Sequence, residues 1–393
     1  MKTADLVSQR ESPKKKSDMS RKAITLSFYR VLFLIVASYG ILYFSYKFYL
    51  PWPGDNDFDQ YHPMYLRPLD FTQADAPFIY RQFSAVATNV VYRMGIFYPN
   101  EIQFAAVGYE QRVFFSVLLS NYVALLLTAI VVGNTIIHIT KSDSLLPPLM
   151  GGMLCFTAFF AQKGVLTEMT EGWTWFLVAI GFYAYLRRQL WFILPVLFLS
   201  IFQKETISIV FGVLAAIDLL ASFWNQKVNS FYKWTFAGSF FTFIGYLLVR
   251  IVLLPVGGKY ESQVNTASMM AHLTNFFTAG FSSTLFFQGF ITQNTYLIFG
   301  FTTLLFTFLQ QKSGLAYLLL QKSYFLPISG AMLLLYLVGI AAGIGNNIGR
   351  IAAILTPIIA TYIVVLLCAI EDNEDNINSG NSIESSLSNH SIM

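Results

Sequence analysis

The sequence is short of charge, and this shortage excludes an ordinary soluble domain. Of its 393 residues only 12% are charged, whereas a soluble domain has about 25%. Hydrophobic residues make up 55% of the chain, and the mean hydropathy is +0.55. Long uncharged runs with this composition predict an all-α polytopic membrane protein. We therefore expect membrane lipid around the chain and no nucleic-acid partner.

Cysteine and histidine are also scarce, which argues against a disulfide scaffold and a zinc site. Cys155 and Cys368 lie inside apolar runs and are expected to be small core residues. The four histidines are scattered and show no metal-ligand spacing; they are His62, His138, His272 and His390. The chain also has no glycine-rich phosphate-binding loop.

A cleavable signal peptide is not expected either. Residues 1–23 are polar and basic, and the first apolar run is too long for the core of a signal peptide. We expect residues 1–23 to form a disordered tail that lies in the cytoplasm, because its basic residues precede the first span. The acidic, Asn/Ser-rich residues 371–393 are expected to form a second disordered cytoplasmic tail.

The apolar runs predict about ten membrane-spanning helices within residues 24–370. A helix needs about 20 apolar residues to cross the hydrocarbon core. The predicted spans are about 25–49, 113–138, 146–162, 172–186, 190–203, 206–224, 234–254, 293–310, 325–344 and 351–370. The connections assigned to the cytoplasm contain Lys141, Arg187, Arg188, Lys227, Lys233, Lys312 and Lys322. This distribution follows the positive-inside rule, and the short loops favour a bacterial inner (plasma) membrane.

The longest outer connection, residues 51–112, contains a predicted amphipathic helix. Its apolar residues are spaced by three or four and share one face, which consists of Ile79, Phe83, Val86, Val90, Met94 and Phe97. The other face is polar and consists of Arg81, Ser84, Thr88, Asn89, Tyr92 and Arg93. This pattern predicts a helix that lies in the membrane interface.

The same connection begins with an acidic stretch that contains Asp55, Asp57 and Asp59. Carboxylates two residues apart point the same way when the segment is extended. Such a set can bind a divalent cation or supply a general base. The alternative is a solvated turn, because Gly, Asn and Asp are turn-forming residues.

Further ionisable residues at the outer side come from distant segments. They are Arg81, Glu168, Glu171, Lys204, Glu205, Arg250 and Arg350. Lys204 and Glu205 follow a short apolar run, and ionisable residues at membrane depth are often functional. Arginine and helix N-termini both favour phosphate, so the cations of this group predict an anion site. The alternatives are interface anchors and a neutralised Lys204–Glu205 pair.

The layout resembles the GT-C fold glycosyltransferases, polytopic enzymes that use lipid-phosphate sugars. The likeness rests on residues 54–62, 77–82, 204–205 and 345–350. It implies that Asp55 or Asp57 is the catalytic base or a ligand of Mg²⁺ or Mn²⁺, and that Lys204 and Arg350 hold the donor phosphate. Asp59, Arg81, Glu205 and Arg250 complete the expected substrate-binding group. The expected layout departs from that family in two ways, because it has no large C-terminal periplasmic domain and only ten predicted spans.

The resemblance implies transfer of a sugar from a polyprenyl-phosphate donor to a glycan or lipid acceptor on the outer face, as in the synthesis of cell-envelope polysaccharide. A polymerase of lipid-diphosphate oligosaccharides is an alternative, since such enzymes also have many spans and large outer loops. A transporter would need paired broken helices and inverted repeats, which the sequence does not show. A non-catalytic membrane scaffold is the remaining alternative.

Overall fold

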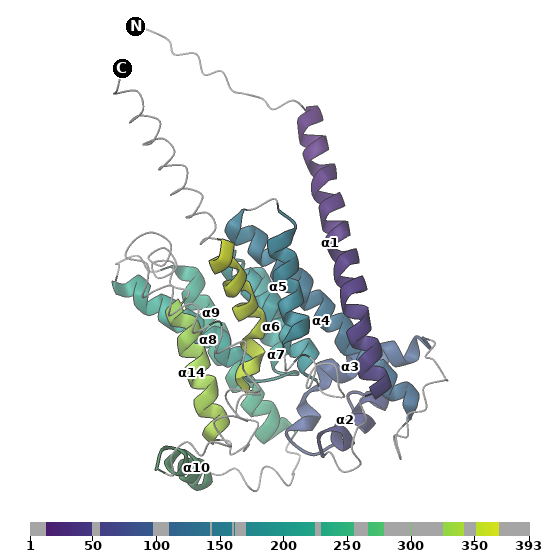
Figure 1. The fold of residues 1–393 in the computed structure, drawn as a ribbon. Helices are drawn as coiled ribbons and strands as arrows, with labels where there is room; N and C mark the ends of the chain where they lie inside the picture. Colours follow the sequence, from purple (N-terminus) through teal and green to yellow (C-terminus); the bar gives the residue numbers. More distant parts are fainter. Residues whose placement is uncertain are drawn as a thin grey trace, which may run out of the picture.

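The protein is a helical bundle in the part that its computed structural model describes (Figure 1). The described residues are 13–48, 56–96, 110–141, 144–158, 161, 170–224, 229–254, 266–278, 300, 325–341 and 351–368. Every regular element within these ranges is a helix, and no strand occurs among them. The all-α prediction is therefore confirmed for this part of the chain.

The helices follow one another with mostly short connections. In chain order they are α1 (Pro13–Phe48), α2 (Asn56–Leu66), η1 (Phe78–Tyr80), α3 (Gln82–Arg93), α4 (Gln111–Thr140), α5 (Leu146–Thr157), α6 (Glu171–Leu186), α7 (Leu190–Ser200), α8 (Thr206–Trp224), α9 (Ser230–Leu248), η3 (Val249–Leu253), α10 (Thr266–Thr278), α14 (Phe325–Ala341) and η6 (Ala353–Leu355). A further helical stretch continues η6 over residues 356–368.

Four of the described helical stretches are long and apolar enough to cross a membrane. They are Thr25–Tyr46, Gln111–Thr140, Thr206–Trp224 and Ser230–Leu253. The other apolar helices are shorter, such as Leu190–Ser200 and Pro327–Ala341. Ten spans therefore remain a prediction, and the predicted span 293–310 falls almost entirely outside the described residues.

Helix α1 begins earlier than the sequence analysis expects. It starts at Pro13, inside the tail that was predicted to be disordered. Proline is well tolerated in the first helical turn, and the lysines and arginines that follow are good helix formers. The apolar span can therefore propagate its helix backwards into this basic segment. Residues 1–12 of the first predicted tail and all of the second, 371–393, lie outside the described residues.

The bundle exposes large apolar side chains and buries polar ones. Trp191 of α7, Val36 of α1 and Phe241 of α9 are 90%, 69% and 68% exposed. Inside the bundle, Ser120 and Thr128 of α4 are fully buried. An exposed apolar surface of this extent is unfavourable in water but suits lipid, so the structure is compatible with an integral membrane protein.

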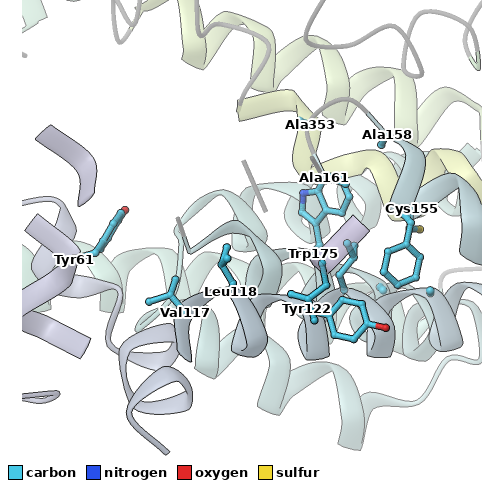
Figure 2. Close-up of a cluster of buried hydrophobic side chains, with 14 of the residues drawn as sticks. Tyr61, Val117, Leu118, Tyr122, Cys155, Ala158, Ala161, Trp175 and Ala353 are labelled. Atoms are coloured by element: carbon cyan, nitrogen blue, oxygen red, sulfur yellow. The ribbon is translucent and has the colours of Figure 1, made fainter. Parts of the chain in front are cut away.

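The core is packed where α4 meets α5 and α6, and where α8 meets α9. Figure 2 shows Tyr122, Cys155 and Trp175 in one apolar cluster. Cys155 is fully buried there, and Cys368 packs against the same cluster. Both positions fit the expectation that these cysteines are core residues.

The two ends of the bundle differ in composition. Helices α2, α3 and α10 gather at the end where α1 terminates, which we call the loop end (Figure 1). The opposite end, where α1 begins, is called the basic end because it presents exposed cations on the α4–α5 and α6–α7 connections and at the start of α9. These are Lys141, Arg187, Arg188 and Lys233.

Candidate functional site

Helix α3 lies within the predicted amphipathic segment but is shorter than predicted, since Ile79 is fully buried in η1 and Phe97 lies outside the described residues. Its polar face is turned into the protein. Ser84, Thr88 and Asn89 are 1%, 2% and 5% exposed, whereas Val90 and Met94 are 54% and 67% exposed. Asn89 donates from Nδ2 to the carbonyl of Tyr65, 2.7 Å away, near the end of α2. The apolar residues Val90 and Met94 are thus on the exposed side of α3, where they can contact lipid.

The first turn of α3 is capped by the turn between α7 and α8. Its N-cap residue, Arg81, makes no side-chain capping bond. Instead, the amide of Phe83 donates to the carbonyl of Phe202 at 2.9 Å, and the amide of Ser84 donates to Oε1 of Gln203 at 3.1 Å. These bonds satisfy amides that an isolated helix leaves without acceptors, and they fix α3 against the α7–α8 turn.

Gln203 also joins this turn to the start of α6. Its Nε2 donates to the carbonyl of Thr170 at 2.8 Å and to the hydroxyl of Thr174 at 2.9 Å. The hydroxyl of Ser84 donates to Oε1 of Gln203 at 2.7 Å. With only 1% of its surface exposed, Gln203 is the buried centre of a network that connects α3, α6 and the α7–α8 turn.

The next residue, Lys204, forms a buried ion pair with Glu171. Nζ of Lys204 lies 3.4 Å from Oε1 of Glu171, and the two side chains are 5% and 1% exposed. The sequence analysis left open a Lys204–Glu205 pair, but the structure pairs Lys204 with the first residue of α6. This contact connects α6 to the α7–α8 turn. Loss of either partner would leave a buried charge without a counter-ion and strongly destabilise the fold.

Glu205 belongs to a second polar group, which is centred on Tyr246 of α9 and which we call the Tyr246 group. Tyr246 interacts electrostatically with Glu205, Arg250 and Arg81. Nη1 of Arg250 donates to the Tyr246 hydroxyl at 3.2 Å. Two guanidinium groups and one carboxylate thus act electrostatically on one buried tyrosine.

Arg81 and Tyr80 connect the Tyr246 group to the first outer connection. Arg81 donates from Nη1 to the Tyr61 hydroxyl, and its Cζ lies 5.6 Å from the centre of the Tyr61 ring. The hydroxyl of Tyr80 donates to the carbonyl of Leu254 at 2.8 Å, and the Tyr80 and Tyr246 rings lie 6.2 Å apart. Tyr80 and Arg81 therefore link α2 to the segment that ends α9.

The acidic stretch is helical where the structure describes it, so the expected extended arrangement is wrong. Asp57 and Asp59 lie in α2, where positions two apart are separated by about 200° around the axis. They cannot present two carboxylates in one direction. Acidic residues favour the first turn of a helix because they complement its positive end, which explains why this stretch is helical.

Asp59 instead shares its helical surface with His62, three residues later. His62 interacts electrostatically with Glu110 and with Asp59. Burial lowers the pKa of His62 from its ordinary value, and the two carboxylates partly oppose this shift. Glu110 also accepts a hydrogen bond from the Tyr92 hydroxyl at 3.2 Å. Asp59, His62 and Glu110 thus form a polar group apart from the Tyr246 group, on the α2, α3 and α4 side of the loop end.

The structure brings together some of the predicted site residues and leaves others undescribed. Arg81, Glu205 and Arg250 meet around Tyr246, while Lys204 pairs with Glu171 next to them. Asp55, Glu168 and Arg350 lie outside the described residues, and only the backbone of Asp57 is described. Within the described ranges no three His, Cys, Asp or Glu side chains form a group that could hold a metal ion. The side chains of Asp55 and Asp57, the expected Mg²⁺ or Mn²⁺ ligands, are not among those described.

Sequence reasoning missed several members of these groups. Tyr246 and Arg250 are four residues apart, and Asp59 and His62 are three apart, so each pair shares a helix face. These spacings were a usable signal. Gln203 had no such signal, because its partners lie 29 to 119 residues away along the chain.

Comparison of the chain with protein-family models, with curated proteins and with solved structures finds no match. The chemistry that the site can perform therefore follows from its own residues. Arg250 donates to the Tyr246 hydroxyl and Arg81 acts on it electrostatically, and two such arginines can hold an oxyanion such as a phosphate. A half-buried carboxylate, Glu205, and the acids of α2 lie on the same end of the bundle and can accept a proton.

Proposed function

We propose that the protein is an integral membrane glycosyltransferase of the GT-C type, which acts at the loop end on a polyprenyl-phosphate sugar. The observation that carries this proposal is that three distant residues act on Tyr246. They are Arg81 from the first connection, Glu205 from the α7–α8 turn, and Arg250 from the end of the span that contains α9. These residues are 45 to 169 positions apart in the sequence. Structural anchors in a membrane interface have no need to converge, whereas a substrate site does.

The orientation of the chain supports a site on the outer face. Lys141, Arg187, Arg188 and Lys233 are exposed at the basic end, and the positive-inside rule assigns such an end to the cytoplasm. The loop end then faces outward, with α3 in the outer interface and both termini in the cytoplasm. This topology is the one expected of a bacterial inner-membrane enzyme that builds a cell-envelope polysaccharide.

In the proposed reaction, Arg81 and Arg250 hold the phosphate of the donor lipid. Asp57, or Asp55 before it, accepts the proton of an acceptor hydroxyl as that oxygen forms a bond to the anomeric carbon of the sugar. The bond from this carbon to the phosphate oxygen breaks, and its electron pair leaves with the lipid phosphate, whose charge the arginines stabilise. Asp57 is one helical turn before Tyr61, which accepts a hydrogen bond from Arg81.

Lys204 and Arg350 have different places in this scheme. Lys204 is buried against Glu171, so it contributes by fixing the α7–α8 turn that presents Glu205. Arg350 remains a proposed phosphate ligand from outside the described residues. A divalent cation, Mg²⁺ or Mn²⁺, would be held by Asp55 and Asp57 and would add positive charge beside the leaving phosphate.

The test is in vitro transfer from a panel of radiolabelled polyprenyl-phosphate sugars by the purified protein in lipid nanodiscs. We expect transfer from one donor, loss of transfer in Asp57→Asn, and a large rise in the KM for the donor in Arg81→Gln. Arg187→Gln, which alters an exposed arginine at the basic end, is the matched control and keeps full activity. Full activity of Asp57→Asn excludes Asp57 as the base.

The same assay separates the competing functions. Product formation only from lipid-diphosphate oligosaccharides identifies a polymerase and excludes the proposed donor. Absence of transfer from every donor, with the protein folded, favours a transporter or a non-catalytic scaffold. Repeating the assay with a chelator and with added Mg²⁺ or Mn²⁺ determines whether the reaction needs a metal.

A further inference from the structure

A buried arginine occupies the membrane span of α1, far from the loop end. Arg30 is 4% exposed and follows the start of the Thr25–Tyr46 span by five residues, which is about 8 Å of helix. Its Nη2 donates to Oδ1 of Asn134 in α4 at 2.6 Å. Arg30 therefore lies in the seam between α1 and α4, near the basic end.

The surroundings of Arg30 leave its charge without a counter-ion in the described part of the chain. The one ion pair among the described residues joins Lys204 to Glu171 at the other end. The Nε atom of Arg30 is buried and has no hydrogen-bond acceptor among those residues. A neutral amide such as that of Asn134 cannot balance a guanidinium charge, and an uncompensated buried charge costs several kcal/mol. An anion beside this guanidinium would therefore stabilise the seam.

The position of Arg30 indicates what this anion is. On α1, the neighbouring Tyr29 is 57% exposed, so lipid can contact the helix next to Arg30. Tyrosine is enriched at the depth of the lipid headgroups. Arg30 lies only about 8 Å of helix inside the start of the span, and a long arginine side chain near the end of a span can reach the phosphate layer.

The charge around the seam is positive, which favours the same ligand. His138 and Lys141 follow Asn134 on α4, and Nζ of Lys141 lies 3.4 Å from Nδ1 of His138. The first turns of α1 carry Lys14, Lys15, Lys16, Arg21 and Lys22. Basic residues next to a span attract anionic lipids. We propose that Arg30 and Asn134 form a binding site for the phosphate of an anionic lipid in the leaflet at the basic end.

The test is the thermal unfolding temperature (Tm) of the purified protein in an uncharged detergent, measured with added phosphatidylglycerol, phosphatidylcholine or inorganic phosphate. A ligand that binds only the folded state raises the Tm. We expect phosphatidylglycerol to raise the Tm of the wild type well above the effect of the other two. Arg30→Gln should lose most of this rise, and Arg30→Lys should keep part of it.

Two controls make the result specific. Arg187→Gln removes an exposed arginine at the same end and should keep the full lipid-dependent rise. If Arg30→Gln does not fold, Asn134→Ala, which keeps the charge but removes the acceptor that positions it, should show a reduced rise. Equal losses in Arg30→Gln and Arg187→Gln would show general electrostatic attraction and overturn the site.

Other outcomes also overturn the proposal. Equal rises with phosphatidylglycerol and phosphatidylcholine remove the requirement for an anionic lipid, and an equal rise with inorganic phosphate removes the lipid. A Tm that none of the added ligands changes shows that no lipid or phosphate occupies the seam and overturns the proposal. Since none of these readouts depends on sugar transfer, they are independent of the function proposed above.

Discussion

Gln203→Met removes the hydrogen bonds of the buried network while keeping nearly the same side-chain length and volume. In the wild type, Gln203 makes four hydrogen bonds, two with Ser84 and one each with Thr170 and Thr174. The hydroxyl of Ser84 retains a second acceptor at 3.3 Å, the carbonyl of Thr170. The amide of Ser84 loses its acceptor, because it belongs to the first turn of α3.

The expected cost follows from these bonds. A buried amide without an acceptor costs about 1–3 kcal/mol, and each of the other hydrogen bonds contributes about 0.6 kcal/mol in a membrane bundle. We therefore expect Gln203→Met to lower the free energy of unfolding by about 3 kcal/mol. Cavity formation contributes little, since the substitution conserves volume.

The measurement is reversible unfolding of the purified protein in mixed micelles. Gln73→Met is the control, because Gln73 bonds to Asp70 in a partly exposed loop and should change stability by less than about 0.5 kcal/mol. Ser84→Ala keeps the capped amide and should cost about 1 kcal/mol. If Gln203→Met is as stable as Gln73→Met, the amide of Ser84 does not depend on Gln203 and our account of α3 is wrong.

Three further predictions concern other parts of the chain. Tyr185→Phe removes the hydroxyl that donates to Asp218 and should cost about 1–3 kcal/mol in the same unfolding assay; an unchanged stability would exclude a net contribution from that bond. Burial lowers the pKa of His62, so the unfolded state binds the proton more readily and stability should fall as the pH drops below about 6.5. In unfolding measured between pH 7 and pH 5, His62→Gln should weaken this loss of stability. A pH profile identical to that of the wild type would contradict the prediction. Gly181→Ala places a Cβ 2.5 Å from Cζ of Phe211 in α8 and should destabilise the protein by about 1–3 kcal/mol. Gly40→Ala, with no atom within 4 Å of its Cβ, should not destabilise it. Equal stabilities of the two variants would show that α6 and α8 can move apart without a cost in free energy.

The helices were predictable because their signal is local. The apolar run 206–224 coincides with α8, and the predicted span 172–186 differs from α6 by one residue. An apolar segment of this kind folds as a helix in lipid whatever its neighbours are, because its backbone must bond internally. Likewise, the alternation of spans places Arg81, Glu205 and Arg250 at one end, as the sequence analysis expected.

The contacts within the site were not predictable in the same way. The sequence shows that α3 has a polar face, but not that this face is buried by Gln203 and Phe202. Nor does it show that Lys204 pairs with Glu171, 33 residues away, in preference to the adjacent Glu205. These choices depend on which helices pack together, and a single sequence contains no direct measure of that packing.

The burial of the polar face determines how the Tyr246 group can respond to a ligand. The same short turn caps α3 through Phe202 and Gln203, pairs with α6 through Lys204, and reaches Tyr246 through Glu205. Movement of Glu205 toward or away from a bound substrate therefore strains the cap of α3. Arg81 lies at that cap, so the position of its guanidinium depends on the turn. The position of a phosphate held by Arg81 would thus be coupled to that of Glu205 through hydrogen bonds that the structure already contains.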